Sequence, residues 1–305
     1  MGTTQHALTI GRPLEATQSH RPPWRFRLQG SDSTWAIAFV IPYVAVFAFF
    51  VVYPVAFGFW MGSSPKLYTL LFSDPKYLTT VTNTLLFVGI GVNVQMFLAF
   101  LLSGFFVIRS WWVRALLAVF LVPWALPAMV VFTSIHFMLV TQWGLVDSLI
   151  RAITGHDGPL FLIHQWVAMG ANIVSYIWKW MPFWTLVFIA ARLAVPQDIY
   201  EAAAIDGAYG TKMLVYVTFP LLANVYLIST LLFTAWTIGD FPTVYFVTTG
   251  APGMTTNVLA TYGYHEAFDF GYPALGVAAM ISALPVLIPV VILLIRRVRA
   301  TGVQL

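Results

Sequence analysis

The chain has 305 residues, of which 60 % are hydrophobic and 9 % are charged, and its mean hydropathy is +0.83. Soluble domains carry about 25 % charged residues, so this composition excludes an ordinary soluble domain. Apolar runs of about 20 residues or more recur, which is typical of membrane-spanning helices and not of barrel strands. The net charge is +4, and the absence of cysteine excludes disulfides, thiol chemistry and cysteine-based metal sites.

The run of elements predicts an all-α polytopic membrane protein with one domain. Residues 1–33 are polar and arginine-rich, which favours a cytoplasmic N-terminal tail over a signal peptide, because no cleavage site ends the first apolar run. A six-span domain over residues 34–299 and a cytoplasmic C-terminal tail over residues 300–305 follow. The six predicted spans are about 35–61, 81–107, 114–139, 164–191, 219–239 and 272–295.

The distribution of basic residues predicts the orientation. With the N-terminus inside, eleven basic residues fall in inner segments and three, Lys66, Lys76 and Arg151, fall in outer ones. The inner set comprises Arg12, Arg21, Arg25, Arg27, Arg109, Arg114, Arg192, Lys212, Arg296, Arg297 and Arg299. This excess indicates that both termini lie on the cytoplasmic side of the membrane. The outer segment 140–163 predicts a short interfacial helix followed by a turn at Gly155–Pro159.

Catalytic signatures are missing from the sequence. There is no Walker A sequence, so we expect no ATP hydrolysis by this chain, and there is no H-E-x-x-H or G-x-S-x-G motif. No cofactor or metal site is predicted. The sequence therefore indicates transport driven from outside this polypeptide.

The segment from about 192 to 218 is charged, although the chain around it is apolar. A helix-forming EAAA stretch at Glu201–Ala204 runs into Asp206-Gly207, a turn signal, and Pro220 opens the next apolar run. The segment predicts a helix, a sharp turn and a second helix in water between two spans.

Spacing in this segment resembles the EAA motif of bacterial ABC-importer permeases, E-A-A-x3-G-x9-I-x-L-P. The family pattern falls on Glu201, Ala202, Ala203, Gly207 and Pro220, while Val217 and Phe219 replace its isoleucine and leucine. The resemblance implies the transmembrane domain of a type I ABC importer. It further implies a coupling helix, including Asp206, that docks on an ATPase.

The partners implied by this resemblance are a second permease subunit, two copies of an ATPase subunit that bind ATP and Mg²⁺, and an extracytoplasmic solute-binding protein. Membrane lipid surrounds such a complex. No nucleic acid is implied.

Two ionisable residues in or near the bilayer need an explanation, because such groups are expensive there. Lys179 lies about midway along the fourth predicted span, and Asp240 follows the fifth. Either they face a wet cavity, or Lys179 snorkels to a headgroup and Asp240 caps a helix. His136, in the third span, is interpreted as a buried hydrogen-bonded histidine, with a substrate contact as the alternative.

A narrower resemblance extends from about residue 35 onward. The Thr249-Gly250-Ala251-Pro252 turn, Tyr53-Pro54, the stretch from Asn83 to Phe87 and the IWKWMPF segment are similar to the maltose and glycerol-3-phosphate type of carbohydrate permease. The resemblance implies import of a sugar or polyol. Carried onto this sequence, it predicts a substrate pathway of Lys179, Trp180, Phe183, Phe233, Trp236, Thr237 and Asp240, to which we add His136.

Three alternatives remain open. An ion-coupled secondary transporter would use Lys179 and Asp240 as a relay, but no inverted repeat is evident. An ABC importer for a non-carbohydrate solute would share the same motif. A membrane-embedded enzyme is disfavoured, because no acid, base, nucleophile or metal set clusters in the sequence.

Overall fold

The computed structural model describes residues 32–300. Helices and the loops between them make up this range, and it contains no strand. Most of the predicted N-terminal tail, and all of the predicted C-terminal tail beyond residue 300, lie outside the described residues. The chain divides into two compact units, residues 1–55 and 56–305, and each is described by itself.

The first unit contains α1 (Asp32–Phe47), the π-helical turn η1 (Ala48–Val52) and the first residues of α2 (Tyr53–Met61). The stretch Ala38–Met61 is helical throughout and is long and apolar enough to cross a membrane, in agreement with the first predicted span. None of its most apolar window is buried inside the chain. Its side chains therefore depend on lipid or on another protein for cover.

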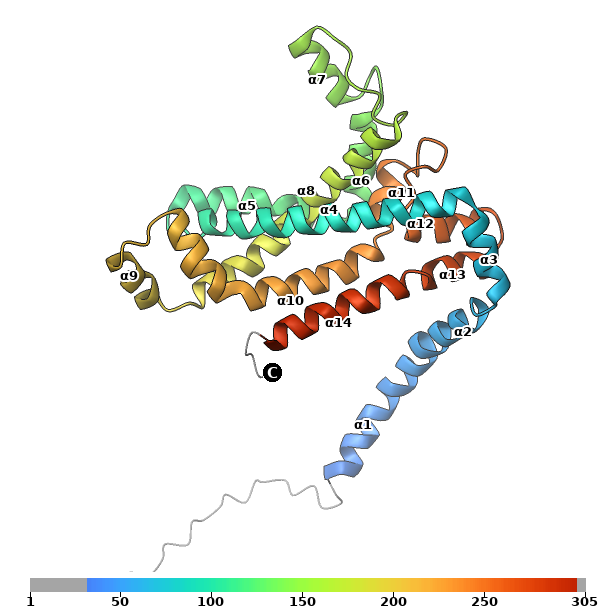
Figure 1. Cartoon of the computed structure of the whole chain (residues 1–305), viewed down its shortest axis with the longest axis horizontal. Coiled ribbons are helices and arrows are strands. Elements are labelled where there is room, and N and C mark those ends of the chain that lie inside the picture. Colours follow the sequence, from blue (N-terminus) through green and yellow to red (C-terminus); the bar gives the residue numbers. More distant parts are fainter. Residues whose placement is uncertain (1–31, 301–305) are drawn as a thin grey trace, which may run out of the picture. The chain divides into compact units, whose positions relative to one another are not determined.

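The second unit holds the packed helices (Figure 1). After α2 they are α3 (Pro65–Ser73), α4 (Pro75–Phe106), α5 (Trp111–Ala125), α6 (Ala128–Leu139), α7 (Leu145–Thr154), α8 (Gln165–Leu193), α9 (Gln197–Ile205), η2 (Met213–Thr218), α10 (Phe219–Ile238), α11 (Pro242–Val247), α12 (Leu259–Tyr264), η3 (His265–Asp269), α13 (Pro273–Ile281) and α14 (Leu284–Ala300). In Figure 1, α4, α10 and α14 run alongside one another, with α9 near one end and α12 and α13 near the other.

The second, fourth and fifth predicted spans are confirmed as long apolar helices: α4, α8 and the continuous η2–α10 stretch Met213–Ile238. The third predicted span, at about 114–139, corresponds to α5 and α6, which together are long and apolar enough for one crossing but meet at an angle of 94°. Pro127 causes the break. The ring disfavours helical backbone at the residue before it, and Leu126 is extended with ψ at 149°.

The sixth predicted span corresponds to α13 and α14, which are 9 and 17 residues long and are separated at Ser282–Ala283. Within residues 32–300 the structure has four helices that could each cross a membrane, or five if α5 and α6 form one span. A sixth crossing stays a prediction.

The centre of the second unit is the pair α4 and α8, which run parallel in a constant register. The Phe87 and Tyr176 rings pack with centroids 4.9 Å apart near the middle of both helices. Toward the C-terminal ends, Arg192 Nε donates to Ser103 Oγ at 2.7 Å, and both pairs are 89 residues apart in sequence. Phe87 is fully buried and Tyr176 nearly so, so the core of the unit lies along this interface.

Two asparagines fasten the loop that follows α11 to this pair. Asn83 Nδ2 donates to Thr255 O at 2.6 Å and to Asn257 O at 3.0 Å. Asn172 Nδ2 donates to Thr248 Oγ1 at 3.0 Å. Because a loop has no regular backbone pairing of its own, buried side-chain donors of this kind are what allow it to lie inside the bundle.

We expect Asn83→Ala to destabilise the protein by roughly 2 to 4 kcal/mol, because it leaves two buried carbonyls unpaired and opens a cavity. The matched control is Asn93→Ala, since Asn93 is exposed on the same helix and bonds only to Gly89 O of its own helix. Thermal unfolding in detergent measures both. Equal melting temperatures for the two variants would contradict this assignment.

Candidate functional site

The segment with the EAA spacing forms the predicted helix, turn and second helix. α9 contains Glu201, Ala202 and Ala203, and it ends at Ile205. Gly207 follows with φ at +81°, a left-handed conformation that glycine adopts without strain. Asp206 is exposed, as is Pro220, which follows the π-helical stretch η2 within the continuous helix Met213–Ile238.

The surface of this segment is open. Glu201 is exposed, and its Oε1 accepts only a local hydrogen bond, from Gln197 Nε2 at 2.8 Å. Ile205 is 87 % exposed and Tyr209 is 68 % exposed. An exposed mixture of apolar side chains and carboxylates, here Asp198 and Glu201 on α9, is suited to docking on another protein.

Arg192 ties this segment to the bundle. It lies in the last turn of α8, four residues before α9, and its guanidinium carbon stacks 4.7 Å from the centre of the Phe100 ring. Besides the bond to Ser103 Oγ, its Nη2 donates to Phe100 O at 3.0 Å. The orientation of the α8 end is therefore fixed on α4.

Lys179 lies at the break between α5 and α6. Its ammonium group donates to the backbone oxygens of Pro123, Trp124 and Leu126 at 2.7, 3.1 and 2.5 Å, and the residue is only 2 % exposed. These carbonyls are among those that the end of α5 leaves without helical partners. An ammonium has three donors, so all of them are used here. This arrangement explains the burial of Lys179, and its predicted contact with substrate stays a prediction.

Three predicted pathway residues come together as an aromatic cluster, which we define as Trp180, Phe183 and Trp236. The Trp236 ring centre lies 5.8 Å from that of Trp180 and 6.0 Å from that of Phe183. Trp124, from the end of α5, adds a fourth ring 5.7 Å from Phe183. Trp236 is 58 % exposed and the other two cluster residues are half-buried, so the cluster presents an accessible aromatic surface.

Two other predicted residues lie behind this surface. Phe233 is fully buried and stacks on Tyr176 with ring centres 5.4 Å apart. Thr237 is 1 % exposed, and its hydroxyl bonds with that of Tyr176 at 2.8 Å. These residues support the wall of the predicted pathway from inside the bundle.

Asp240 is half-buried in the link between α10 and α11. Its Oδ2 accepts from the backbone N of Thr243 at 3.2 Å, and its own N–H donates to Thr237 O at 3.1 Å. Burial raises the pKa of the Asp240 carboxyl to about 6. Among the salt bridges of residues 32–300, none joins Asp240 to Lys179.

Among the described residues, His136 makes no ring contact with the aromatic cluster. It is half-buried on α6, and its Nδ1 donates to Val247 O, at the end of α11, at 2.8 Å. The expected hydrogen-bonded histidine is therefore present. In the part of the chain that the structure describes, no group of three or more His, Asp or Glu residues could hold a metal ion.

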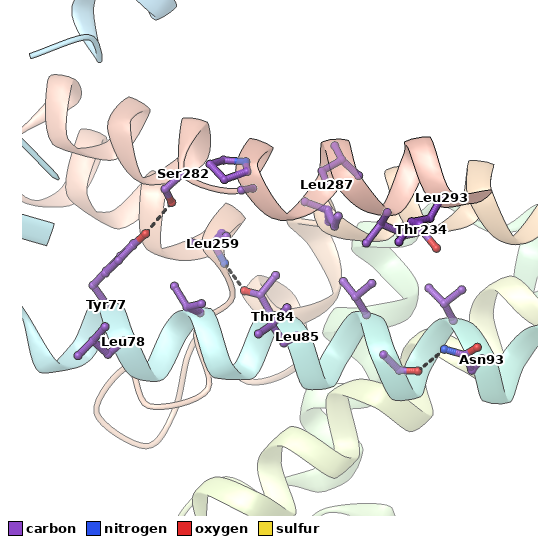
Figure 2. Close-up of a pocket in the computed structure, with 18 of the residues that line it drawn as sticks. Tyr77, Leu78, Thr84, Leu85, Asn93, Thr234, Leu259, Ser282, Leu287 and Leu293 are labelled. Carbon is purple, nitrogen blue, oxygen red and sulfur yellow. Dashed lines mark hydrogen bonds between the residues drawn. The ribbon is translucent and has the colours of Figure 1, made fainter. Parts of the chain in front are cut away.

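A separate cavity of about 830 Å³ lies between α4, α10 and α14 (Figure 2). Its lining is largely apolar, and its polar groups are used internally: Tyr77 donates to Ser282 Oγ at 2.7 Å, and Thr84 Oγ1 accepts from Leu259 N at 2.9 Å. None of the predicted pathway residues lines it. A sugar requires free polar partners, so this cavity does not fit one.

Sequence reasoning missed the residues that hold the site in place. Asn83 and Asn172 stand inside apolar runs, where polar side chains usually have structural or functional partners, and this signal was available. Tyr176 and Trp124 gave no signal, because aromatic residues are common along all the spans.

The chain is similar to a known protein family over more than half of its length. The family described as binding-protein-dependent transport system inner membrane component matches residues 95–300. The chain belongs to this family. It is therefore a multi-pass membrane protein and a transport component of a binding-protein-dependent system.

Curated relatives of this inner membrane component cover most of its length. The sulfoquinovosyl glycerol transport system permease protein of Agrobacterium fabrum is 27 % identical over 94 % of this chain and 98 % of that protein. The trehalose/maltose transport system permease protein of Thermococcus litoralis is 28 % identical over 80 % of this chain and 88 % of that protein. The sn-glycerol-3-phosphate transport system permease protein of Brucella suis is 31 % identical over 66 % of this chain and 68 % of that protein.

A solved structure shares the fold. A chain of a bacterial alginate ABC transporter, in complex with an alginate pentasaccharide-bound periplasmic protein, superposes with a TM-score of 0.79. The match covers 90 % of this chain and 97 % of that chain at 20 % identity. The predicted fold class, an all-α ABC-importer transmembrane domain, is confirmed.

We expect Lys179→Met to lower the stability of this membrane component by about 3 kcal/mol, because three carbonyls at the end of α5 lose their donor. Lys66→Met, a change at an exposed lysine, serves as the control. The measurement is the apparent melting temperature in detergent. A variant with normal stability and an altered substrate preference would show instead that Lys179 contacts the solute.

Proposed function

We propose that the chain is a permease subunit of an ATP-driven bacterial importer for a sugar or polyol, forming half of the translocation pathway. One observation carries the proposal: the complete EAA spacing lies on an exposed helix–turn–helix between two membrane helices of a chain in this family. This chain has no ATP-binding motif of its own. An ATP-driven complex therefore needs a segment of this kind, through which the chain contacts a separate ATPase subunit.

In this proposal α9 is the coupling helix. Its alanines permit close approach to a groove on an ATPase subunit, and Glu201 pairs with a basic residue there. Two ATPase copies bind ATP and Mg²⁺, and their closure moves α9. Arg192 supports this role, because it attaches the α8 end that carries α9 to Phe100 and Ser103 of α4.

The substrate class is supported by the aromatic cluster and by the relatives. Sugars bind to proteins through aromatic faces and a few polar groups, and the cluster has Asp240 in the link that follows Trp236. The named relatives transport sulfoquinovosyl glycerol, trehalose/maltose and sn-glycerol-3-phosphate. Because the rings of the aromatic cluster are bulky, we infer a small ligand: a monosaccharide, a disaccharide or a polyol.

The remaining partners complete the pathway. A second, different permease subunit closes the cavity from the other side, and an extracytoplasmic solute-binding protein delivers the ligand. Both termini and α9 lie in the cytoplasm, as the excess of basic residues in the inner segments indicates. Transport then alternates between an outward-open and an inward-open cavity.

An ion-coupled relay through Lys179 and Asp240 has less support. The three donors of Lys179 are bound to the end of α5, and no ion pair joins the two residues in the described part of the chain. A relay needs a group that can exchange its proton with a neighbour.

Glu201→Ala and Glu201→Arg should uncouple transport from ATP hydrolysis while the complex stays assembled. Loss of a charge pair at an interface weakens the binding free energy by about 2 kcal/mol or more, so we expect transport to fall roughly tenfold or more. Asp198→Asn, on the same helix but outside the motif, is the control. Uptake and ATPase activity are measured in proteoliposomes with the copurifying subunits. Normal uptake by both Glu201 variants would contradict the proposed coupling role.

Trp236→Ala should weaken transport of the solute by roughly tenfold, because it removes the exposed ring of the aromatic cluster. The matched control is Trp178→Ala, which removes a ring of the same size that is 47 % exposed on α8 and that, within residues 32–300, makes no ring contact with the cluster. The readout is the solute concentration that half-saturates transport. If the two variants behave alike, the pathway lies elsewhere.

A further inference from the structure

Helix α7 has its acidic residue inside and a stripe of apolar residues outside. Asp147 is 1 % exposed, and its carboxylate accepts from Gln142 N at 3.1 Å, Gly158 N at 2.7 Å and Arg151 Nη2 at 3.1 Å. These bonds close the loop around the helix and fix its rotation about its own axis. A helix on the surface of a soluble domain has the opposite arrangement.

The outward face is a stripe of large apolar side chains. Leu145, Leu149 and Ile153 are four residues apart, so they lie on one face of the helix, and they are 53 %, 52 % and 82 % exposed. Trp143, just before the helix, is 79 % exposed. Within one turn of this stripe, Ser148 provides an exposed polar position.

The elements on both sides of α7 continue this apolar surface. Phe137, near the end of α6, is 62 % exposed, and Trp166, in the first turn of α8, is 64 % exposed. α8 is one of the membrane-crossing helices, so α7 is tethered to the bilayer. Figure 1 shows α7 projecting away from the packed helices α4 and α10.

The charged residues of the helix lie on the face opposite the stripe, because Asp147 and Arg151 are four residues apart and pair with each other. Arg151 is 47 % exposed at its side chain and also pairs with Asp157, which is 76 % exposed, at 3.0 Å. A short helix with an apolar face, a tryptophan beside it and an arginine on its polar face has the composition of a segment that lies in a membrane interface.

We propose that α7 lies along the bilayer surface, with Leu145, Leu149, Ile153 and Trp143 inserted among the lipids. The occupant of this face is lipid, because the stripe continues the exposed apolar surface of neighbouring membrane helices and because the charged residues of α7 lie on the opposite face. The helix thereby anchors the link between α6 and α8 at a fixed depth.

The chain has no cysteine, so single cysteines can be introduced without removing any. Leu149→Cys and the adjacent control Ser148→Cys each receive a nitroxide spin label in the full-length chain, with its copurifying subunits, in phosphatidylethanolamine–phosphatidylglycerol vesicles. Power saturation then compares collisions with oxygen, which concentrates in lipid, and with a water-soluble nickel complex. The unsubstituted chain in the same preparation supplies the background from other subunits.

The expected result is a depth parameter, the logarithm of the oxygen-to-nickel accessibility ratio, that is positive at position 149 and negative at position 148. A label at 149 that collides freely with nickel would overturn the proposal by placing the stripe in water. A label there that is immobilised and shielded from both reagents, with or without added solute-binding protein, would overturn it by placing the stripe against a protein.

Discussion

The structure of the second unit depends on one capping interaction, the ammonium of Lys179 on the free carbonyls of α5. A helix that ends inside a membrane leaves backbone oxygens that water cannot reach, and the free-energy cost of each is several kcal/mol. Pro127 forces such an end at Leu126. The lysine supplies a donor to each of three of these oxygens, so the chain can turn through 94° and send α6 in a new direction.

The same principle operates along the α4–α8 interface. Asn83 and Arg192 stand within apolar helices and bind backbone: Asn83 holds the loop after α11, and Arg192 holds the end of α4. The predicted pathway lies at the edge of this framework, where Trp236 remains exposed. The hydrogen bonds inside the bundle and the exposed aromatic rings are compatible, because these hydrogen bonds fix the positions of the helices that carry the rings.

Hydropathy predicted the positions of most spans, because a bilayer requires long apolar helices whatever their neighbours are. It did not predict the bend at Leu126, since proline is tolerated inside membrane helices and a break at one depends on whether the freed backbone finds a partner. Lys179 was recognised as a residue that needed explanation, but its three acceptors belong to another helix more than fifty residues earlier. Phe233 was placed in the pathway by resemblance, yet residue type cannot reveal which face of α10 is buried.

The parallel pairing of α4 and α8 has a mechanical consequence. The two helices are joined near the middle by the Phe87 and Tyr176 rings and toward their C-terminal ends by the Arg192 bond to Ser103, and α4 alone is about 48 Å long at 1.5 Å per residue for its 32 residues. Neither helix can slide past the other without separating these contacts, so the pair behaves as one stiff strut. Under the coupling role that we propose for α9, the pair carries a displacement of α9 as a unit toward the threonine-rich loop that Asn83 and Asn172 bind.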